Sequence, residues 1–467
     1  MSAPAGPVST AAPGGLVARD FTRISVGGFG DPHNRLAHSM AWFDDHLYVG
    51  TTRNHIESER AAGRPSGAQI WRYSPGAERW ELAFQSPLVR AGDGSETPRD
   101  LGYRGMIVFQ GPSDERPALY VTTISRLGAL VLRSEDGQAF TAVSPAGMGR
   151  PGNVAYRMLV PFRGRLYVWP AGRSGVLTES VERDLDIDAL VYESEDPAGG
   201  RWRPVSAPGF GNGGNLFVFD MAAFEDELYA GTFNPVSGYQ IWKTDAAGEP
   251  PYRWRSVLRN GAGRGARNET VASMYAFRGS LYAGSGVPGF GYDRVHEVGR
   301  AAAELVRING DRTWDLITGD RRRTASGAKE PLSGFGPGFG NSFNSAFWRM
   351  VEHDGHLYVG TYDWSSYLSF LAAKASPRRR GMVPPMVAKQ GGFDLWRSAD
   401  GRRWVQVTGN AFNTPFVYGL RTFASTPVGL FVGSVGLAMG GSGVGNRGAN
   451  NAGTRGGGLE IWLGRRA

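Results

Sequence analysis

The chain has 467 residues, of which 41% are hydrophobic and 20% charged, and its formal net charge is +8. This composition is typical of a folded globular protein, and no apolar run approaches the ~18 residues that a membrane span requires. The absence of Cys excludes disulfides and thiolate metal sites. The basic excess is mostly arginine, which suits forked contacts with carboxylate or phosphate groups.

The chain begins with MSAPAGPVSTAAPGG, which has neither the basic start nor the apolar stretch of a secretion signal. We therefore predict a disordered leader over residues 1–18, followed by a single domain over residues 19–467. A cytoplasmic location is expected, and a secreted protein whose signal has been removed is the alternative. The 69 glycines and 28 prolines are spread along the chain, which favours many short strands joined by turns.

One sequence unit recurs seven times along the chain. Its anchor is Leu followed by Tyr or Phe, and a run of apolar residues and a short turn precede each anchor, which predicts a β-hairpin. A third apolar segment follows each anchor, and in six of the units a fourth segment opens with an aromatic residue such as Trp80 or Trp404. The anchors are Leu47-Tyr48, Leu119-Tyr120, Leu166-Tyr167, Leu228-Tyr229, Leu281-Tyr282, Leu357-Tyr358 and Leu430-Phe431.

The seventh unit has no fourth segment, because the sequence ends shortly after Trp462. A matching segment lies near the N-terminus, where Phe21–Ser25 is similar to the fourth segment Trp202–Ser206. The pattern therefore predicts an all-β protein, a seven-bladed β-propeller of four-stranded antiparallel blades. The N-terminal strand is expected to pair in the last blade and so to cover edges that would otherwise be unpaired.

Two resemblances accompany this pattern. The hairpin with its later Trp resembles a Kelch-type blade, and the segments Ser134–Phe140 and Ser398–Trp404 resemble the sialidase Asp-box, each one residue short. In that family the box closes a turn through local hydrogen bonds and performs no catalysis. The resemblance implies an architecture, and no specific functional family is indicated.

Long loops are expected on one face of the propeller. They are residues 172–188, 318–344, 362–393 and 433–458. Long loops at one rim of a rigid scaffold are a usual place for binding and catalysis. The alternative is that these long loops are insertions that take no part in function.

A short polar residue lies six residues before the Met or Leu of each first strand. These positions hold Asn34, Asp100, Asn153, Asn215, Asn268, Asn344 and Thr414. Such side chains commonly tie loop backbone into turns, and the other reading is a ring that faces a ligand. Asn34 and Asn153 are the ligand-binding candidates of this set.

Two residues before the same Met or Leu, the side chains differ between units. The positions hold His38, Arg104, Arg157, Phe219, Ala272, Trp348 and Tyr418. Such divergence suits one asymmetric ligand, so we predict His38, Arg104 and Arg157 as catalytic residues, with His38 as the acid–base group and the arginines as a carboxylate clamp. Trp348 and Tyr418 are predicted to bind the ligand.

Asp220 and Arg349 lie one position later in their strands and are added as ligand-binding candidates. Salt bridges between blades are the alternative for them.

His33 and His38, with Asp31, are candidates for a divalent metal site, although a surface His is the commoner outcome. The sequence identifies no cofactor.

The leading hypothesis is a monomeric, small-molecule-binding propeller, an enzyme of the lyase, hydrolase or isomerase type that acts on an anionic substrate at the channel mouth. A protein-interaction scaffold, using Trp364, Tyr367, Leu368 and Phe370, is one alternative, and a carbohydrate-binding propeller is another. Nucleic acid is not expected as a partner, because the basic clusters Arg321–Arg323 and Arg378–Arg380 are not interleaved with stacking aromatics.

Overall fold

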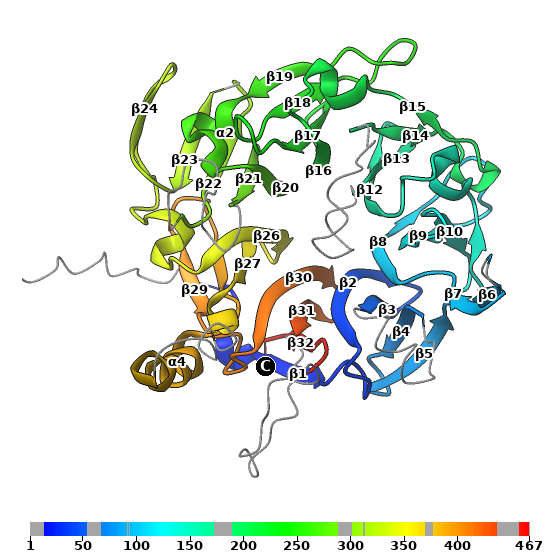
Figure 1. Cartoon of the computed structure of the whole chain (residues 1–467), viewed down its shortest axis with the longest axis horizontal. Coiled ribbons are helices and arrows are strands. Elements are labelled where there is room, and N and C mark those ends of the chain that lie inside the picture. The colour runs from blue at the N-terminus through cyan, green and yellow to red at the C-terminus, as the bar shows by residue number, and fades with distance from the viewer. Residues whose placement is uncertain are drawn as a thin grey trace, which may run out of the picture.

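The computed structural model describes residues 14–53, 67–90, 92, 94–171, 189–287, 301–311, 313–368, 377–436 and 457–466. The fold is all-β and of the propeller type, because small antiparallel sheets are arranged around a common centre (Figure 1). None of the described helices is long and apolar enough to cross a membrane.

The described strands pair in groups of four that follow the chain order, except that β1 is the fourth strand of the last group, and the first strand named in each group is innermost (Figure 1). The groups are β2 (Asn34–Phe43), β3 (His46–Arg53), β4 (Gln69–Ser74) and β5 (Arg79–Gln85); β8 (Gly102–Phe109), β9 (Ala118–Ile124), β10 (Val131–Ser134) and β11 (Thr141–Ala142); β12 (Tyr156–Phe162), β13 (Arg165–Pro170), β14 (Tyr192–Ser194) and β15 (Arg203–Pro204); β16 (Phe217–Phe224), β17 (Glu227–Phe233), β18 (Ile241–Thr244) and β19 (Arg255–Leu258); β20 (Thr270–Phe277), β21 (Ser280–Gly286), β22 (Leu305–Asn309) and β23 (Trp314–Thr318); β26 (Asn344–His353), β27 (His356–Asp363), β28 (Leu395–Ser398) and β29 (Val405–Thr408); and β30 (Val417–Thr426), β31 (Gly429–Gly436), β32 (Ile461–Gly464) and β1 (Phe21–Ser25).

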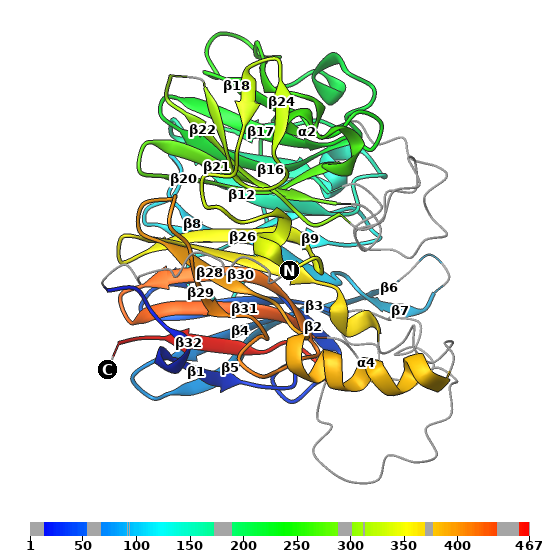
Figure 2. The same ribbon diagram turned by 90° about the vertical axis from the view of Figure 1, so that its left-hand side faces the viewer.

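The remaining described elements lie outside these groups. Two short hairpins pair β6 (Leu88–Arg90) with β7 (Glu96–Pro98) and β24 (Arg322–Thr324) with β25 (Gly327–Lys329). The helix α2 (Asn260–Gly263) is a single turn, and α4 (Pro377–Gln390) lies at the rim of the molecule beside the short helix η9 (Ser365–Tyr367) (Figures 1 and 2).

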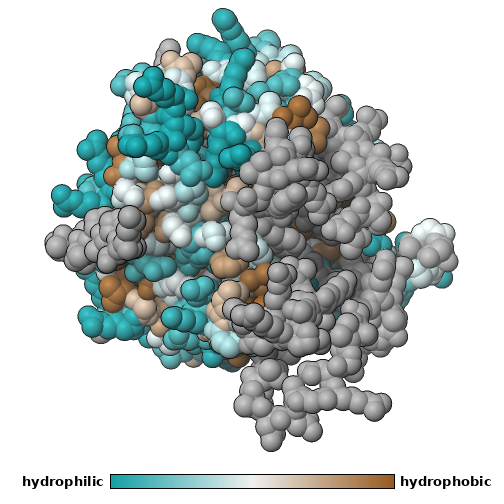
Figure 3. Space-filling view, turned by 60° about the vertical axis from the view of Figure 1, so that its left-hand side comes forward, coloured by the Kyte–Doolittle hydropathy of each residue, from teal (hydrophilic) through white to brown (hydrophobic). Residues whose placement is uncertain are grey.

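The hydrophobic core lies between neighbouring sheets. One cluster joins Trp169 and Val191 of the third group to Met221 and Leu228 of the fourth, and the other clusters repeat this pattern around the centre. On the face shown in Figure 3, the described hydrophobic residues are scattered among hydrophilic ones. Apolar burial therefore holds each sheet against the next, and the described surface on this face is mostly hydrophilic (Figure 3).

The N-terminal strand β1 pairs with β32, the last described strand of the chain. The register matches Phe21 with Gly464 and Arg23 with Trp462. Of the predicted leader, residues 1–13 lie outside the described residues, but Leu16 is only 2% exposed and its backbone N–H donates to the Tyr358 hydroxyl at 2.8 Å. The N-terminal segment thus contacts two neighbouring sheets.

Deleting residues 1–25 should lower the melting temperature by ~10 °C or prevent folding, because it leaves the edge of β32 unpaired and uncovers the cavity that Leu16 fills. Thermal unfolding followed by circular dichroism, with size-exclusion chromatography to detect aggregation, measures the effect. Deletion of residues 1–13 is the matched control, since it removes none of the described contacts. Equal melting temperatures for the two deletions would show that β1 contributes little.

The two Asp-box-like turns close through local hydrogen bonds. In the first, the Asp136 carboxylate accepts bonds from the backbone N–H groups of Gln138 and Ala139, each at 2.8 Å, and the Ser134 hydroxyl accepts one from Gly137 at 2.9 Å. The turn at Asp400 repeats this arrangement. Gly137 has φ of 69°, and a Cβ there would collide with the Tyr48 hydroxyl of the neighbouring sheet. These turns therefore dock one sheet against the next.

Candidate site at the central cavity

A β-bulge interrupts each innermost strand near its start. In β2, the pairing with β3 passes from Ala37 to Ser39 and omits His38. A bulge of this kind redirects the side chain of the extra residue. Equivalent irregularities in the other inner strands include Arg104, Arg157, Phe219, Ala272, Trp348 and Arg421.

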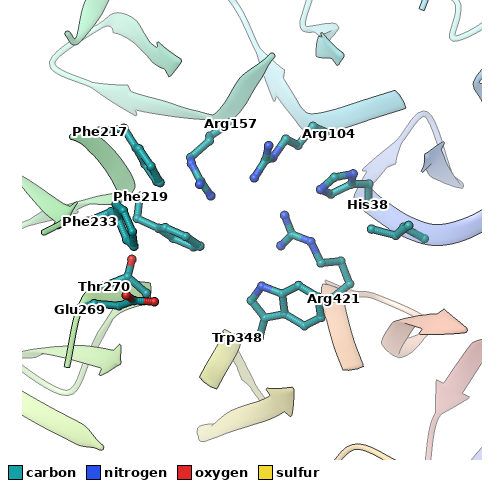
Figure 4. A pocket seen from close by; sticks show the side chains of 11 residues that line it. His38, Arg104, Arg157, Phe217, Phe219, Phe233, Glu269, Thr270, Trp348 and Arg421 are labelled. Carbon is teal, nitrogen blue, oxygen red and sulfur yellow. The ribbon is translucent and has the colours of Figure 1, made fainter. Parts of the chain in front are cut away.

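These bulge residues line two adjoining cavities at the centre of the molecule. The first has a volume of about 260 Å³ and the second about 320 Å³, and both are bordered by Phe219, Thr270 and Trp348. Three guanidinium groups and the imidazole of His38 approach the first cavity from one side, and aromatic side chains and Glu269 lie across it (Figure 4). Its lining residues are Leu36, His38, Arg104, Arg157, Phe217, Phe219, Phe233, Glu269, Thr270, Trp348 and Arg421.

Arg104, Arg157 and Arg421 are buried, with exposures of 5%, 3% and 3%. Burial lowers the pKa of each guanidinium, and the neighbouring arginines lower it further. Nε and Nη1 of Arg104, Nε of Arg157 and Nη1 of Arg421 have no hydrogen-bond partner within the described part of the chain. Buried donors of this kind are costly unless something accepts their hydrogen bonds.

Aromatic rings hold two of these arginines in place. The guanidinium carbon of Arg157 lies 3.6 Å from the centre of the Phe219 ring, and that of Arg421 lies 5.1 Å from the Trp348 ring. Cation–π contacts stabilise a guanidinium without occupying its N–H donors. The donors at the edge of each group are therefore left for a ligand.

His38 is 5% exposed, and its Nδ1 lies 2.6 Å from the Thr52 hydroxyl. Burial lowers the pKa of His38 well below its usual value, and the positive charges of Arg421 and Arg104 lower it further. The imidazole is thus neutral at physiological pH. A neutral ring fixed through one nitrogen can exchange a proton with a bound molecule.

Asp220 and Arg349 do not line either cavity. Their side chains approach each other at 3.6 Å, and the Asp220 carboxylate also accepts a hydrogen bond from the backbone N–H of Met274 at 2.8 Å. These contacts connect β16, β20 and β26, so the pair joins neighbouring sheets. Asp220 and Glu269 are both carboxylates near the central arginines, and Arg349 engages Asp220.

The predicted ring of short polar residues braces loops. The side-chain amides of Asn34 and Asn153 donate to the carbonyls of Gly28 and Gly147, in each case at 3.0 Å. Asn215, Asn268 and Asn344 make the same contact with the loop that precedes them. Neither Asn34 nor Asn153 lines either of the two central cavities.

The structure places Trp348 in both cavities but Tyr418 outside them. Tyr418 is 7% exposed and packs edge-on against Tyr362 and Tyr367. The cavity residue of β30 is Arg421, which the sequence analysis missed. In six of the units, counting back nine residues from the anchor Leu gives His38, Arg157, Phe219, Ala272, Trp348 and Arg421, so the anchor would have identified Arg421. In the second unit the same count gives Gln110 and not Arg104.

The structure does not form the predicted metal site from its described residues, which contain no group of three His, Cys, Asp or Glu side chains placed to hold an ion. His33 is exposed and lies outside both cavities, whereas His38 lines one.

In the predicted interaction patch, Trp364 is only 6% exposed, and Phe370 lies outside the described residues. Residues 172–188 and most of residues 433–458, two of the predicted long loops, also lie outside the described residues.

No protein-family model matches the chain, and no curated protein matches it. Among solved structures it is similar to a puromycin hydrolase, with 12% identity, a TM-score of 0.47, and coverage of 86% of this chain and 50% of the other. It is also similar to YCF48 from Cyanidioschyzon merolae, with 11% identity, a TM-score of 0.45, and coverage of 95% and 98%. It is similar as well to an oligogalacturonate lyase from Vibrio parahaemolyticus, with 8% identity, a TM-score of 0.45, and coverage of 95% of this chain and 93% of the other.

The chain spans about half the length of the puromycin hydrolase and of a xyloglucanase from Xanthomonas campestris, of which it covers 50% and 53%. Similarity at this level transfers no activity. The function must therefore be inferred from the cavity itself.

Proposed function

We propose that the chain is a seven-bladed β-propeller that binds a small anionic molecule in its central cavity. The four-stranded groups support the blade count, and the pairing of β1 with β32 supports closure of the ring in the last blade. The burial of Leu16 supports a start of this single domain slightly before the predicted residue 19.

The observation that carries the function is the convergence of three buried arginines with unpaired N–H donors on one cavity. Near them, Asp220 is the buried carboxylate, and it is shared with a fourth arginine, Arg349. Such an excess of buried positive charge is unfavourable by itself. A carboxylate or phosphate would neutralise it and accept the free donors in bidentate geometry.

We extend the proposal to catalysis at His38. An anion held by Arg104, Arg157 and Arg421 lies beside a neutral imidazole, which is suited to take a proton from the ligand or give one to it. Lyase, hydrolase and isomerase reactions all use such a group. Product analysis decides among them.

Isothermal titration calorimetry at low salt tests the binding, with phosphate, acetate, phenyl phosphate and glucose 1-phosphate set against neutral phenol and glucose. The anions should bind and the neutral molecules should not. Arg104→Ala and Arg157→Ala should each raise Kd by ~100-fold, because each removes a charge-assisted, desolvated contact. Arg321→Ala is the matched control, since its side chain is 78% exposed.

The proposed function is wrong if no anion binds, or if Arg104→Ala and Arg157→Ala bind anions as tightly as the wild type. For catalysis, NMR follows conversion of each bound anion. His38→Ala should stop conversion and change Kd by less than ~3-fold, because the ring is neutral.

A further inference from the structure

The second cavity adjoins the cationic one but has a different character. Its lining includes Phe219, Ala272, Gly286, Trp348 and Tyr362, and none of its described lining residues is charged. Its volume of about 320 Å³ is at the lower end of the ~300–1,000 Å³ typical of small-molecule sites. The two cavities meet at Phe219, Thr270 and Trp348, so one ligand can extend through both.

We propose that the ligand is an anion with one charged end, which lies among Arg104, Arg157 and Arg421, and with a flat, uncharged ring that lies in the second cavity between Phe219 and Trp348. This inference rests on the proposed function and specifies the class of ligand that the site accepts.

The second cavity exists because of one small residue. At the bulge position the other inner strands have His, Arg, Phe or Trp, whereas β20 has Ala272. Gly286, which pairs with Thr270, is also small, and a Cβ at that position would lie 3.7 Å from the Ala272 Cβ. The space beside Phe219 and Trp348 is therefore the volume that a larger side chain in place of Ala272 would occupy.

The walls of this space suit a ring. Phe219 and Trp348 present aromatic surfaces on either side of the boundary between the cavities, and aromatic surfaces pack well against planar groups. The Thr270 hydroxyl is buried at this boundary and has no hydrogen-bond partner among the described residues. It can bond a polar substituent on the ring.

The charges of the first cavity also fix the orientation of the ligand. The guanidinium groups approach from the side of β8, β12 and β30, and Glu269 lies on the opposite wall beside Thr270 (Figure 4). A second anionic group at the far end of the ligand would lie in the second cavity, where none of the described lining residues is positively charged. The site therefore favours a molecule that is charged at one end only.

The wild-type affinities for phosphate, phenyl phosphate and glucose 1-phosphate test this inference. We expect both esters to bind at least ~10-fold more tightly than phosphate, because each adds a ring to the second cavity. Tighter binding of phenyl phosphate than of glucose 1-phosphate supports the flat ring, and the reverse order would overturn it in favour of a sugar, whose ring is not flat. If phosphate binds as tightly as both esters, the two-part ligand is excluded while the anion site stands.

Ala272→Phe should fill the second cavity, remove the ~10-fold advantage of the esters, and leave the affinity for phosphate unchanged. Ala247→Phe, at an exposed position, is the matched control and should keep the advantage. Ala272→Val gives a smaller step if the Phe variant does not fold. Retention of the full advantage in a folded Ala272→Phe protein would overturn the placement of the ring, and failure of every anion to bind would overturn the proposed function as well.

Discussion

Replacing Arg421 by Met should raise the stability of the ligand-free protein while weakening anion binding by ~100-fold. Arg421 is 3% exposed, its Nη1 has no described hydrogen-bond partner, and Arg349 and Arg104 repel it. Met retains the apolar packing against Trp348 and removes the buried charge. Apolar replacement of buried ionic groups can stabilise a protein by ~1–4 kcal/mol.

Thermal unfolding without ligand and calorimetry with phenyl phosphate measure the two effects on the same sample. Arg321→Met is the control and should change neither quantity, because its side chain is 78% exposed. A gain in stability together with a loss of anion affinity distinguishes a ligand-binding arginine from a structural one. A fall in melting temperature for Arg421→Met would show that this guanidinium stabilises the fold.

Asp363→Asn should stabilise the protein by a few kcal/mol at pH 8 and have a smaller effect at pH 5. Asp363 and Asp394 are both buried, and the amide of Asn341 donates to both carboxylates. Burial, together with the charge of Asp394, raises the pKa of Asp363 to about 7, and burial raises that of Asp394 to about 6.

The equivalent positions of other sheets explain this effect. Asn344 pairs with Asp363 across the strands in the same way that Asn34 pairs with Arg53. Arg53 donates to the Asn34 side-chain oxygen at 3.0 Å, whereas the corresponding oxygen of Asn344 has no described donor. A protonated Asp363, or an Asn in its place, can supply that donor.

The sign of the pH dependence follows from the raised pKa. The folded state retains the proton of Asp363 up to about pH 7, whereas the unfolded chain releases it near the ordinary Asp pKa of 3.8. The stabilisation is therefore complete below pH ~4 and is lost as the pH rises to ~7. Urea unfolding between pH 5 and 8 measures it, with exposed Asp45→Asn as the control. An unchanged pH dependence in Asp363→Asn would show that Asp363 is not responsible.

The repeated hairpins and the role of Phe21–Ser25 could be read from the sequence, because strand period, anchor and turn recur in every unit. His38, Arg104, Arg157 and Trp348 were found for the same reason, since their positions repeat relative to the core. Arg421 was missed because the count was made from Leu420, which precedes the bulge residue of β30, whereas the Met used in β2 and in β26 follows the bulge residue of its strand. The position of a bulge depends on pairing register, which one strand's sequence does not reveal.

The sequence also did not reveal which partners surround each polar residue. Asp220 and the bulge residue Phe219 are adjacent in the chain, yet the one bonds a neighbouring sheet and the other borders the cavity. Asn34 is of a residue type that often contacts ligands, but its side-chain amide donates a hydrogen bond to the Gly28 carbonyl of the preceding loop. These distinctions depend on partners that are far apart in the sequence, so composition and spacing could not supply them.

The pairing of β1 with β32 also constrains how the protein folds. Phe21 leaves the ribosome more than four hundred residues before Gly464, its partner in the register. Throughout that interval the first strand lacks its strand partner, although the carbonyl of Ile24 can already accept the hydrogen bond of the Trp80 indole. The pairing of these two distant chain segments therefore has to wait until the last strand has been made, and contacts between residues so far apart in the sequence are slow to form.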